Sequence, residues 1–390
     1  MADQPDEAED VLLDAEGFAE SCGEPLDRVL DIDTWEADPD LAALCQRIED
    51  EVGDAVEAEN RYGAAARREV LSRIADRPGA PQGAGFYQAT PDQLECVCRQ
   101  VLFNGAVEAC DGTLKQFETL PLTITQIGVC LTAYQGSQQS FAHRLFQRDL
   151  RIQSGDLIQD LMDLLDNRAS RNTGAGPSML FRRGLMTYAE RTILTDKSQA
   201  PWRMGHGNPV PYELLTGSGS MDLLQRSLTI LRRLILDRKR FVFIPSEDGD
   251  KRLLTLGYAL RAGEYAIVQT AQAQMQKVVD GGHYSRQDRA KADVFCHEVG
   301  PQVVMGVYRA AGGAPPQIFY SHVEHCHEAA LIVMADSLLQ DHRGFPLLID
   351  LADRLCRAAF GNDIFDGAIQ SAYARADAPF RFLGERQTRG

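Results

Sequence analysis

The sequence predicts a mixed α/β fold, with helices on the faces of a mixed β-sheet. From about residue 105 onward, segments rich in β-branched and aromatic residues alternate with segments whose apolar residues have helical spacing. The first strands follow one another as a hairpin, helices come next, and strands and helices then alternate, an order typical of a mixed sheet flanked by helices. A chain of 390 residues with 44% hydrophobic content is long enough to bury a large core.

Composition and periodicity place the individual elements. Strands are expected at 105–110, 121–134, 241–245, 264–270, 302–308, 316–322 and 329–335. Helices are expected at 154–167, 178–194, 220–238, 253–260, 284–299 and 345–360. Ser220 is a typical N-cap residue and Asp222 lies in the first turn, where acids are favoured. Just before this helix, "PVPYELLTGSGS" predicts a short strand and a Gly-Ser turn.

Acidic residues are concentrated at the N-terminal end. Residues 1–60 hold 21 Asp and Glu but two Arg, a net charge of −19, whereas the rest holds 35 acids and 38 bases, a net charge of +3. Apolar spacing predicts an amphipathic helix from Asp40 toward Ile74, either a solvated arm or a helix that docks a partner. "RPGAPQGAGF" (77–86) is a linker signal. We therefore expect an acidic, helical N-terminal region (1–76), a linker (77–90) and a main domain (91–390).

Several functional classes lack their signals in this sequence. There is no run of 18 apolar residues, and the N-terminus lacks the basic start and apolar stretch of a secretory signal, so we expect a cytoplasmic protein that does not contact membranes. The nine cysteines are scattered and are expected to be reduced thiols. The sequence contains no GxxxxGK[ST], GxSxG or HExxH motif, so it does not encode a P-loop motor.

Two carboxylates are candidates for chemistry. Asp111 follows a mostly apolar strand in "EACDGT", and the Asp-Gly pair is either a hairpin corner or a strand end that offers a metal-binding carboxylate. Glu190 lies in a predicted helix with three arginines around it, so it is either a surface ion-pair partner or a second ligand that faces Asp111.

Basic residues gather at the end of the helix at 220–238. They are Arg232, Arg233, Arg238, Lys239 and Arg240, with Arg144, Arg148 and Arg151 earlier in the chain. Cations at a helix end complement the helix dipole, and the same groups can neutralise the phosphates of a nucleic acid. Both interpretations remain open from the sequence.

Histidine and cysteine cluster in "SHVEHCHEAAL" (321–331). His322, His325, Cys326 and His327 lie within six positions, but on a strand they alternate between two faces. A zinc site therefore needs further ligands, for which "FCHEVG" (295–300) is a candidate source. Otherwise the segment is a polar strand end.

The order of these segments resembles the NurA family, DNA-end-processing nucleases that partner HerA hexameric ATPases. The resemblance covers about residues 105–385. "EACDGT" resembles the Asp-Gly-Ser strand end that opens the family pattern, "PYELLTGSGSMDLLQRSLTILRRLILDRKRFVFIPSED" its strand-turn-helix-strand block, "LRAGEYAIVQ" the next strand and "HRGFPLLIDLADRLCRAAF" the closing segment.

The resemblance implies an RNase H-like core and a metal-dependent DNA nuclease that uses Mn²⁺ or Mg²⁺. It implies that Asp111 is the first metal-binding carboxylate and Glu190 the second. It further implies DNA and a HerA-like hexameric ATPase as partners, a homodimer, and a role in DNA end processing, repair or phage defence.

Three positions depart from the family pattern. Thr216 stands where the family usually has an aspartate, Phe345 where it has a tyrosine, and Asp353 where it has a histidine. Glu213 or Asp353 can supply a substitute catalytic carboxylate. The departures also favour an alternative: a catalytically weakened or inactive NurA-like adaptor that scaffolds a motor complex.

Overall fold

The computed structural model describes residues 15–35, 40–118, 122–135, 140–149, 158–159, 162, 179–245, 251–282 and 284–379. The chain divides into two compact units, Met1–Ala65 and Ala66–Gly390. The described part of the first unit contains α1 (Ala15–Cys22), α2 (Leu26–Leu30) and most of α3 (Leu41–Glu69). The described part of the acidic region is therefore largely helical, α3 matches the helix expected from Asp40 toward Ile74, and α3 buries none of its residues.

One mixed β-sheet forms the centre of the second unit. Across the described residues, nine strands run in the order β1-β7-β8-β9-β6-β5-β2-β3-β4. Their bounds are β1 (Gly85–Gln88), β2 (Val107–Glu118), β3 (Leu122–Thr132), β4 (Ser140–Asp149), β5 (Trp202–His206), β6 (Phe241–Ile244), β7 (Glu264–Thr270), β8 (Val303–Arg309) and β9 (Gln317–His322). β5 runs parallel to both β2 and β6, and the other neighbouring pairs are antiparallel.

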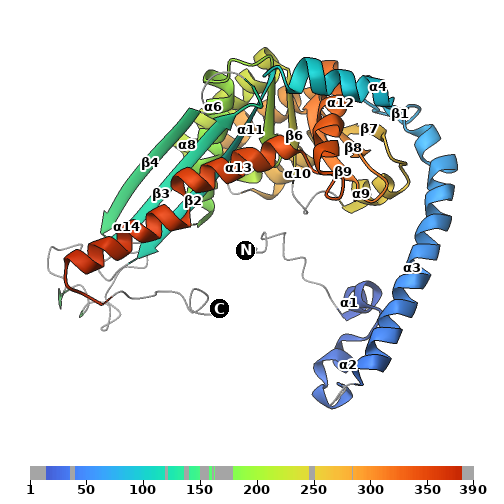
Figure 1. Cartoon of the computed structure of the whole chain (residues 1–390), viewed down its shortest axis with the longest axis horizontal. Helices are drawn as coiled ribbons and strands as arrows, with labels where there is room; N and C mark the ends of the chain where they lie inside the picture. Colours follow the sequence, from blue (N-terminus) through green and yellow to red (C-terminus); the bar gives the residue numbers. More distant parts are fainter. Residues whose placement is uncertain are drawn as a thin grey trace. The chain divides into compact units, whose positions relative to one another are not determined.

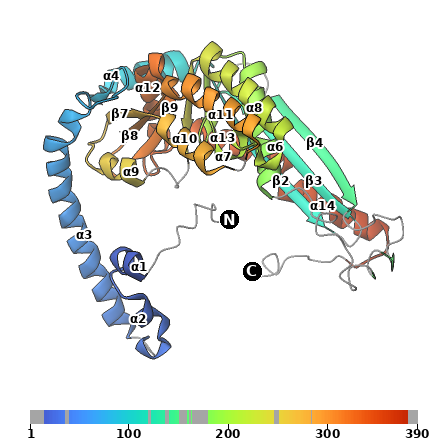
Figure 2. The same cartoon turned by 180° about the vertical axis from the view of Figure 1, so that it is seen from behind.

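Helices cover both faces of this sheet. One face carries α6 (Met179–Asp196), α8 (Met221–Arg232) and α11 (Arg286–Val299), and the other carries α12 (Cys326–Ser337) and α13 (Leu347–Phe360). Figure 1 shows α13 in front of β2 and β3, and Figure 2, seen from behind, shows α6, α8 and α11 in front of the sheet. The mixed α/β fold predicted from the sequence is therefore confirmed.

Strand alternation divides the core between the two faces. In β6, Phe241 and Phe243 pack with the α6 and α8 layer, whereas Val242 and Ile244 pack with the α12 and α13 layer. In β2, Ala109 faces α13 and Cys110 faces α6. The same alternation fixes the direction of every side chain in the site described below.

Further helices complete the unit. They are α4 (Pro91–Val97), α7 (Tyr212–Leu215), α9 (Lys251–Tyr258), α10 (Gln272–Gly281) and α14 (Asn362–Arg375). Ser220 caps α8 by accepting a hydrogen bond from the backbone N–H of Leu223 at 3.3 Å, as predicted. The predicted helix at 220–238 continues past α8 as a π-helical turn from Arg233 to Arg238.

Most predicted elements form close to their expected positions. β3, β6, β7, β8 and β9 and helices α6, α8, α9, α11 and α13 match their predictions within a few residues. The predicted helix at 154–167 lies mostly outside the described residues; within it, residues 158–159 and 162 are helical. The sequence did not reveal β1, β4, β5, α4, α10 or α14.

Three predictions are wrong. The apolar run 329–335 lies in α12, because a short run of this kind fits a buried helix as well as a strand. The expected short strand at 209–215 contains α7 instead. Within the expected linker, residues 85–88 form β1, which pairs with β7 at the edge of the sheet.

Among the described residues, no helix combines the length and apolarity that crossing a membrane requires.

Candidate acidic centre beside β2

Asp111 lies where β2 loses one of its two neighbours. The parallel pairing of β2 with β5 ends at Cys110 opposite Gly205, so Asp111 is the first residue beyond it. On its other side β2 continues its antiparallel pairing, with Asp111 opposite Cys130. The expectation that Asp111 ends a strand or forms a hairpin corner is therefore wrong. Ligand sites are common where parallel strands part at their carboxyl ends.

Glu190 reaches the same point from α6. Both side chains are almost fully buried, with exposed fractions of 8% for Asp111 and 5% for Glu190. By strand alternation Asp111 faces α13, whereas Glu190 approaches β2 from the α6 face. Both lie beside Gly112: its N–H donates to Asp111 Oδ1 at 2.9 Å, and a Cβ added there would overlap Glu190 Oε1. The glycine therefore makes room for the second carboxylate.

Arg191 is the buried cation beside Glu190. Its Nη1 donates to Glu190 Oε2 at 3.2 Å, and its Nη2 donates to the backbone oxygens of His206 and Asn208 at 3.1 and 2.7 Å. The guanidinium also lies over the ring of Phe243, 4.3 Å from its centroid. The one arginine is thus shared among a carboxylate, backbone carbonyls and an aromatic face.

Burial and crowding disfavour the charged forms of both carboxylates. Burial raises the pKa of Asp111 well above its usual value, and the charges of Glu190 and Asp353 raise it further. Burial likewise raises the pKa of Glu190 to about 7, with Arg191 opposing the rise and Glu213 adding to it. Without a bound cation, both shifts favour the protonated forms of the two carboxylates.

Glu213 and Asp353, the two candidate substitute carboxylates, lie on opposite sides of this centre. Glu213 lies on α7 and forms an ion pair with Arg183, whose Nη2 lies 3.1 Å from Glu213 Oε1. Asp353 lies on α13 and accepts from Arg357 one helical turn later, at 2.6 Å. Both are close enough to affect the pKa of a central carboxylate, but each already has an arginine partner.

The structure explains what two of the departures from the family pattern do locally. Thr216 follows α7, and its hydroxyl donates to the backbone oxygen of Tyr212 at 2.8 Å and accepts from the N–H of Ser218 at 3.3 Å. Its hydroxyl thus serves the turn rather than the centre. Phe345 is 9% exposed and packs edge-on against His206, with ring centroids 5.9 Å apart.

His206 belongs to this centre, although sequence reasoning missed it. It is the last residue of β5, and its Nδ1 lies 3.9 Å from Asp111 Oδ1. Burial and the charge of Arg191 lower the pKa of His206. The signal was a histidine at the end of a short apolar stretch before Gly-Asn-Pro, a turn sequence.

The predicted DNA-binding residues lie near the N-terminal ends of the parallel strands β5 and β6, the opposite ends from Asp111 and His206. Residues 233–238 and Lys239 lead into the start of β6, and the backbone oxygen of Arg240 accepts from Arg203 at the start of β5. Asp111 and His206 lie beyond the far ends of the β2–β5 pairing. The structure therefore does not bring the basic residues and the carboxylates together.

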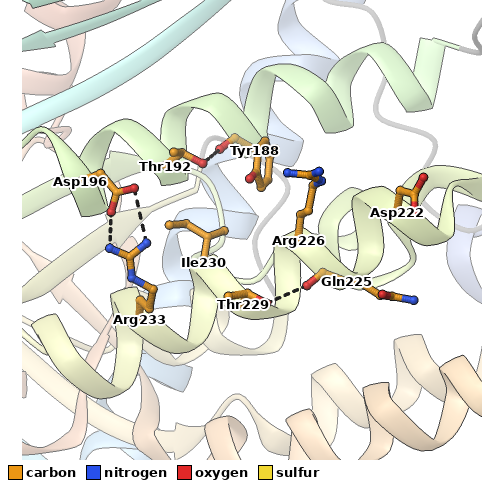
Figure 3. A pocket seen from close by; sticks show the side chains of 9 residues that line it. All are labelled: Tyr188, Thr192, Asp196, Asp222, Gln225, Arg226, Thr229, Ile230 and Arg233. Carbon is orange, nitrogen blue, oxygen red and sulfur yellow. Dashed lines mark hydrogen bonds and ion pairs between the residues drawn. The ribbon is translucent and has the colours of Figure 1, made fainter.

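Three of the five basic residues already hold acidic partners. Arg232 pairs with Glu298, Arg233 with Asp196 and Lys239 with Glu324, at 2.8, 2.6 and 2.8 Å. Figure 3 shows the Asp196–Arg233 pair at one end of a polar cleft between α6 and α8. Arg238 lines a second cleft together with Arg203. The side chain of Arg148 and all of Arg151 lie outside the described residues.

The histidine and cysteine cluster does not lie on one strand. β9 ends at His322, residues 323–325 form a 3₁₀ turn, and α12 begins at Cys326. The face alternation expected for a strand therefore does not apply. His322 Nδ1 accepts from the N–H of Glu324 at 3.1 Å, and His327 Nδ1 lies 3.1 Å from the hydroxyl of Tyr265. These histidines serve local contacts.

The donors at the acidic centre fit a hard divalent cation in type and charge. Within the described part of the chain, no three His, Cys, Asp or Glu side chains are grouped so that they can hold a metal ion as they stand. Mg²⁺, however, is commonly held by one or two carboxylates, with water and substrate phosphates as its other ligands. Asp111 and Glu190, both buried beside Gly112, are two such carboxylates.

Comparison with known proteins finds similarity to solved structures alone. No protein family profile and no curated protein matches the chain. The NurA nuclease from Sulfolobus solfataricus superposes with a TM-score of 0.46 at 8% identity, covering 85% of this chain and 98% of that one. NurA with manganese gives 0.39 at 10% identity, covering 73% and 95%, and NurA bound to dAMP and manganese gives 0.39 at 8%, covering 79% and 92%. The likeness lies in the path of the backbone.

Proposed function

We propose that this protein is a metal-dependent nuclease that hydrolyses DNA phosphodiester bonds with Mn²⁺ or Mg²⁺. The observation that carries the proposal is that two buried carboxylates, Asp111 and Glu190, both lie beside Gly112. Buried charges are retained in proteins when they are paired or bind a metal. Burial, and after it the charge of Glu190, raises the pKa of Asp111, and a bound divalent cation would favour its charged form.

The roles of the residues follow from their positions. A bound divalent ion supplies Lewis-acid stabilisation of phosphate charge and an activated water. Asp111 on β2 and Glu190 on α6 are the residues that would hold the ion. Asp353 and Glu213 lie at the border of the centre, where their paired arginines, Arg357 and Arg183, can turn toward a phosphate.

The partners we propose come from the order of the sequence motifs. The resemblance to NurA supports a homodimer that binds DNA and works with a HerA-like hexameric ATPase in DNA end processing, repair or phage defence. The basic residues at 232–240 are proposed to contact DNA away from the reacting phosphate, because they lie at the other edge of the strands.

A cleavage assay tests the proposal. The full chain with Mn²⁺ is expected to degrade linear DNA, and EDTA or Asp111→Asn is expected to lower the rate at least about 100-fold, because the anchoring charge is lost. Asp280→Asn on α10 is the control, since Asp280 pairs with Arg289 on the surface. Equal cleavage by Asp111→Asn and the wild type contradicts the metal role of Asp111.

Specific observations favour a second candidate function, that of an inactive adaptor. The hydroxyl of Thr216 is used by its own turn, Phe345 has no polar group, and Asp353 is paired with Arg357. An adaptor is expected to bind a HerA-like ATPase while neither the wild type nor Asp111→Asn cleaves DNA. Co-purification with the ATPase, measured beside the cleavage assay, separates the two functions.

A further inference from the structure

A cleft at the start of β5 is lined by two arginines, Arg203 and Arg238. The segment between α6 and β5 forms one side of the cleft, and the end of the π-helical turn forms the other. Among the described residues, neither arginine forms an ion pair, whereas the three neighbouring basic residues described above each hold an acid. The cleft therefore contains cations whose charge the described part of the chain does not neutralise.

Arg203 is the buried cation of this cleft, with an exposed fraction of 5%. Its Nε donates to the backbone oxygen of Leu194 at 2.9 Å, and its Nη1 donates to that of Pro201 at 3.3 Å. These carbonyls orient the guanidinium without a carboxylate, and Nη2 has no hydrogen-bond partner in the described part of the chain. Because buried charges in proteins are usually paired, the open Nη2 indicates an anion that is supplied from outside the chain.

A hydroxyl and a second guanidinium add further donors. Ser198 lines the cleft at 5% exposure, and its buried Oγ has no hydrogen-bond partner among the described residues. A buried hydroxyl normally has such a partner, so this one calls for an acceptor. Burial, and after it the charge of Arg238, lowers the pKa of Arg203, because the two guanidinium groups repel each other. An anion in the cleft offsets that repulsion.

The loop that carries Ser198 is held in place by a carboxylate from the sheet. Glu108 on β2 accepts from the N–H groups of Gln199 and Ala200 at 2.8 and 3.1 Å. The carboxylate of Glu108 is therefore used by the loop backbone, although its charge also favours the protonated form of Arg203. With the loop and the buried guanidinium both fixed, the donors are preorganised for a ligand.

We propose that this cleft binds a phosphate group, with Ser198, Arg203 and Arg238 as its donors. A phosphate offers several acceptor oxygens that point in different directions, so it suits donors from separate chain positions better than a planar carboxylate does. Two sources supply this group: the backbone of a DNA strand and a free phosphate monoester. For the first source the inference rests on the proposed DNA binding, and for neither source does it depend on cleavage.

Two carboxylates also line the cleft, Asp196 and Asp237. Asp196 is already paired, since Nη2 of Arg233 lies 2.6 Å from its Oδ1. Asp237 is exposed and has no ion-pair partner among the described residues, so its charge opposes an anion. Asp237→Asn is therefore expected to strengthen phosphate binding by about twofold to fivefold.

Binding measured in EDTA tests the site without cleavage. The probes are a fluorescent single-stranded oligonucleotide that lacks terminal phosphates, followed by anisotropy, and thymidine monophosphate, followed by calorimetry. Ser198→Ala is expected to weaken binding by about fivefold and Arg238→Ala by about tenfold. Neither change removes a hydrogen bond within the described residues, so both variants are expected to fold, which circular dichroism checks. Arg289→Ala, which changes an exposed arginine paired with Asp280, is the matched control and keeps its affinity.

The two probes distinguish the sources of the phosphate. Loss of affinity for the oligonucleotide in both cleft variants assigns the cleft to a strand phosphate, and loss for thymidine monophosphate alone assigns it to a free monoester. The inference requires both variants to lose affinity for the same probe. Any other result overturns it, including a wild type that binds neither probe. If the affinity losses appear but the wild type with Mn²⁺ does not cleave DNA, the proposed nuclease function fails and the phosphate site stands.

Discussion

Glu190 and Arg191 are neighbours in sequence that share one buried environment. Arg191 is 1% exposed, and its charge is divided among Glu190, backbone carbonyls and the ring of Phe243. A buried carboxylate that is only partly compensated stabilises the fold best when it is protonated or bound to a cation. The folded state of this protein therefore depends on what occupies the acidic centre.

The stability of the metal-free protein is expected to fall as pH rises from about 4.5 to about 7. Glu190 has an ordinary pKa of 4.5 when exposed and about 7 when folded, so in this range the folded state binds more protons than the unfolded state. Proton loss then favours unfolding, by up to about 3 kcal/mol across the range. Urea unfolding in EDTA at several pH values measures this effect.

The comparison with Glu190→Gln isolates the contribution of this residue, because other titrating groups are common to both proteins. The variant is expected to lose the decline, and saturating Mn²⁺ is expected to remove it from the wild type. The quantity to compare is the difference in free energy of unfolding between the wild type and Glu190→Gln. If this difference is the same at pH 7 as at pH 4.5, the raised pKa proposed for Glu190 is contradicted.

At the scale of elements, the centre exists because β2 and β5 part while α6 packs closely on β2. The close approach requires a residue without a side chain at position 112, since Glu190 and Met186 occupy the place of its Cβ. Neither the Asp-Gly pair nor the helix alone produces this contact. The parallel pairing of β5 with β2, which stops at Cys110 and Gly205, is equally necessary because it brings His206 beside Asp111.

Gly112→Ala is expected to lower Mn²⁺ affinity and cleavage by about tenfold or more. The new methyl group displaces the Glu190 carboxylate, while the strand itself tolerates alanine. Calorimetric Mn²⁺ titration and circular dichroism measure the two effects. Gly367→Ala on α14 is the control, because a Cβ there meets nothing within 4 Å, and alanine favours a helix by about 1 kcal/mol over glycine.

The start of α8 gives an independent test of local structure. Ser220→Ala is expected to lower the free energy of unfolding by about 1 kcal/mol, because the N–H of Leu223 loses its acceptor. Ser220→Gly is expected to cost only a few tenths of a kcal/mol, since glycine also suits an N-cap. Chemical denaturation compares the two, and an equal loss in both contradicts a capping role.

At the scale of the whole molecule, most of the net negative charge and the β-sheet lie in different parts of the chain. The acids of residues 1–60 give a net charge of −19, while the described sheet and its helices lie in the unit Ala66–Gly390. Arg67, at the end of α3, forms a bidentate ion pair with Glu264 on β7, so the second unit begins with a fixed contact. A truncation that ends at Ala65 therefore leaves this ion pair in place.

Deletion of residues 1–65 is expected to leave a folded protein that binds DNA more tightly. The deletion removes 21 of the 56 acidic residues and three arginines, so the net charge changes from −16 to +2, and the loss of repulsion strengthens contacts with phosphates. Fluorescence anisotropy with labelled DNA at several salt concentrations measures affinity. If affinity is unchanged at low salt and association with a HerA-like ATPase is lost, the region is a docking arm instead.

The sequence predicted most strands of the sheet but not which strands pair with one another. β7, β8 and β9 were predicted from their β-branched and aromatic content. Such side chains suit strands that are mostly buried, as these three are. β5 was missed because five residues containing arginine and histidine do not alternate. The segment 329–335 was assigned to a strand because a fully apolar run has no period that separates helix from strand.

The amino-acid order alone determined the fold class, the acidic N-terminal helices, the N-cap of α8 and the identity of the carboxylates Asp111 and Glu190 as candidates. These features depend on local spacing and composition, which act within a few residues. The tertiary structure alone decided that both carboxylates lie beside Gly112, that His206 lies near Asp111, and that the basic residues lie at the other end of the parallel strands. Long-range strand pairing and helix packing set those distances, and no local pattern encodes them.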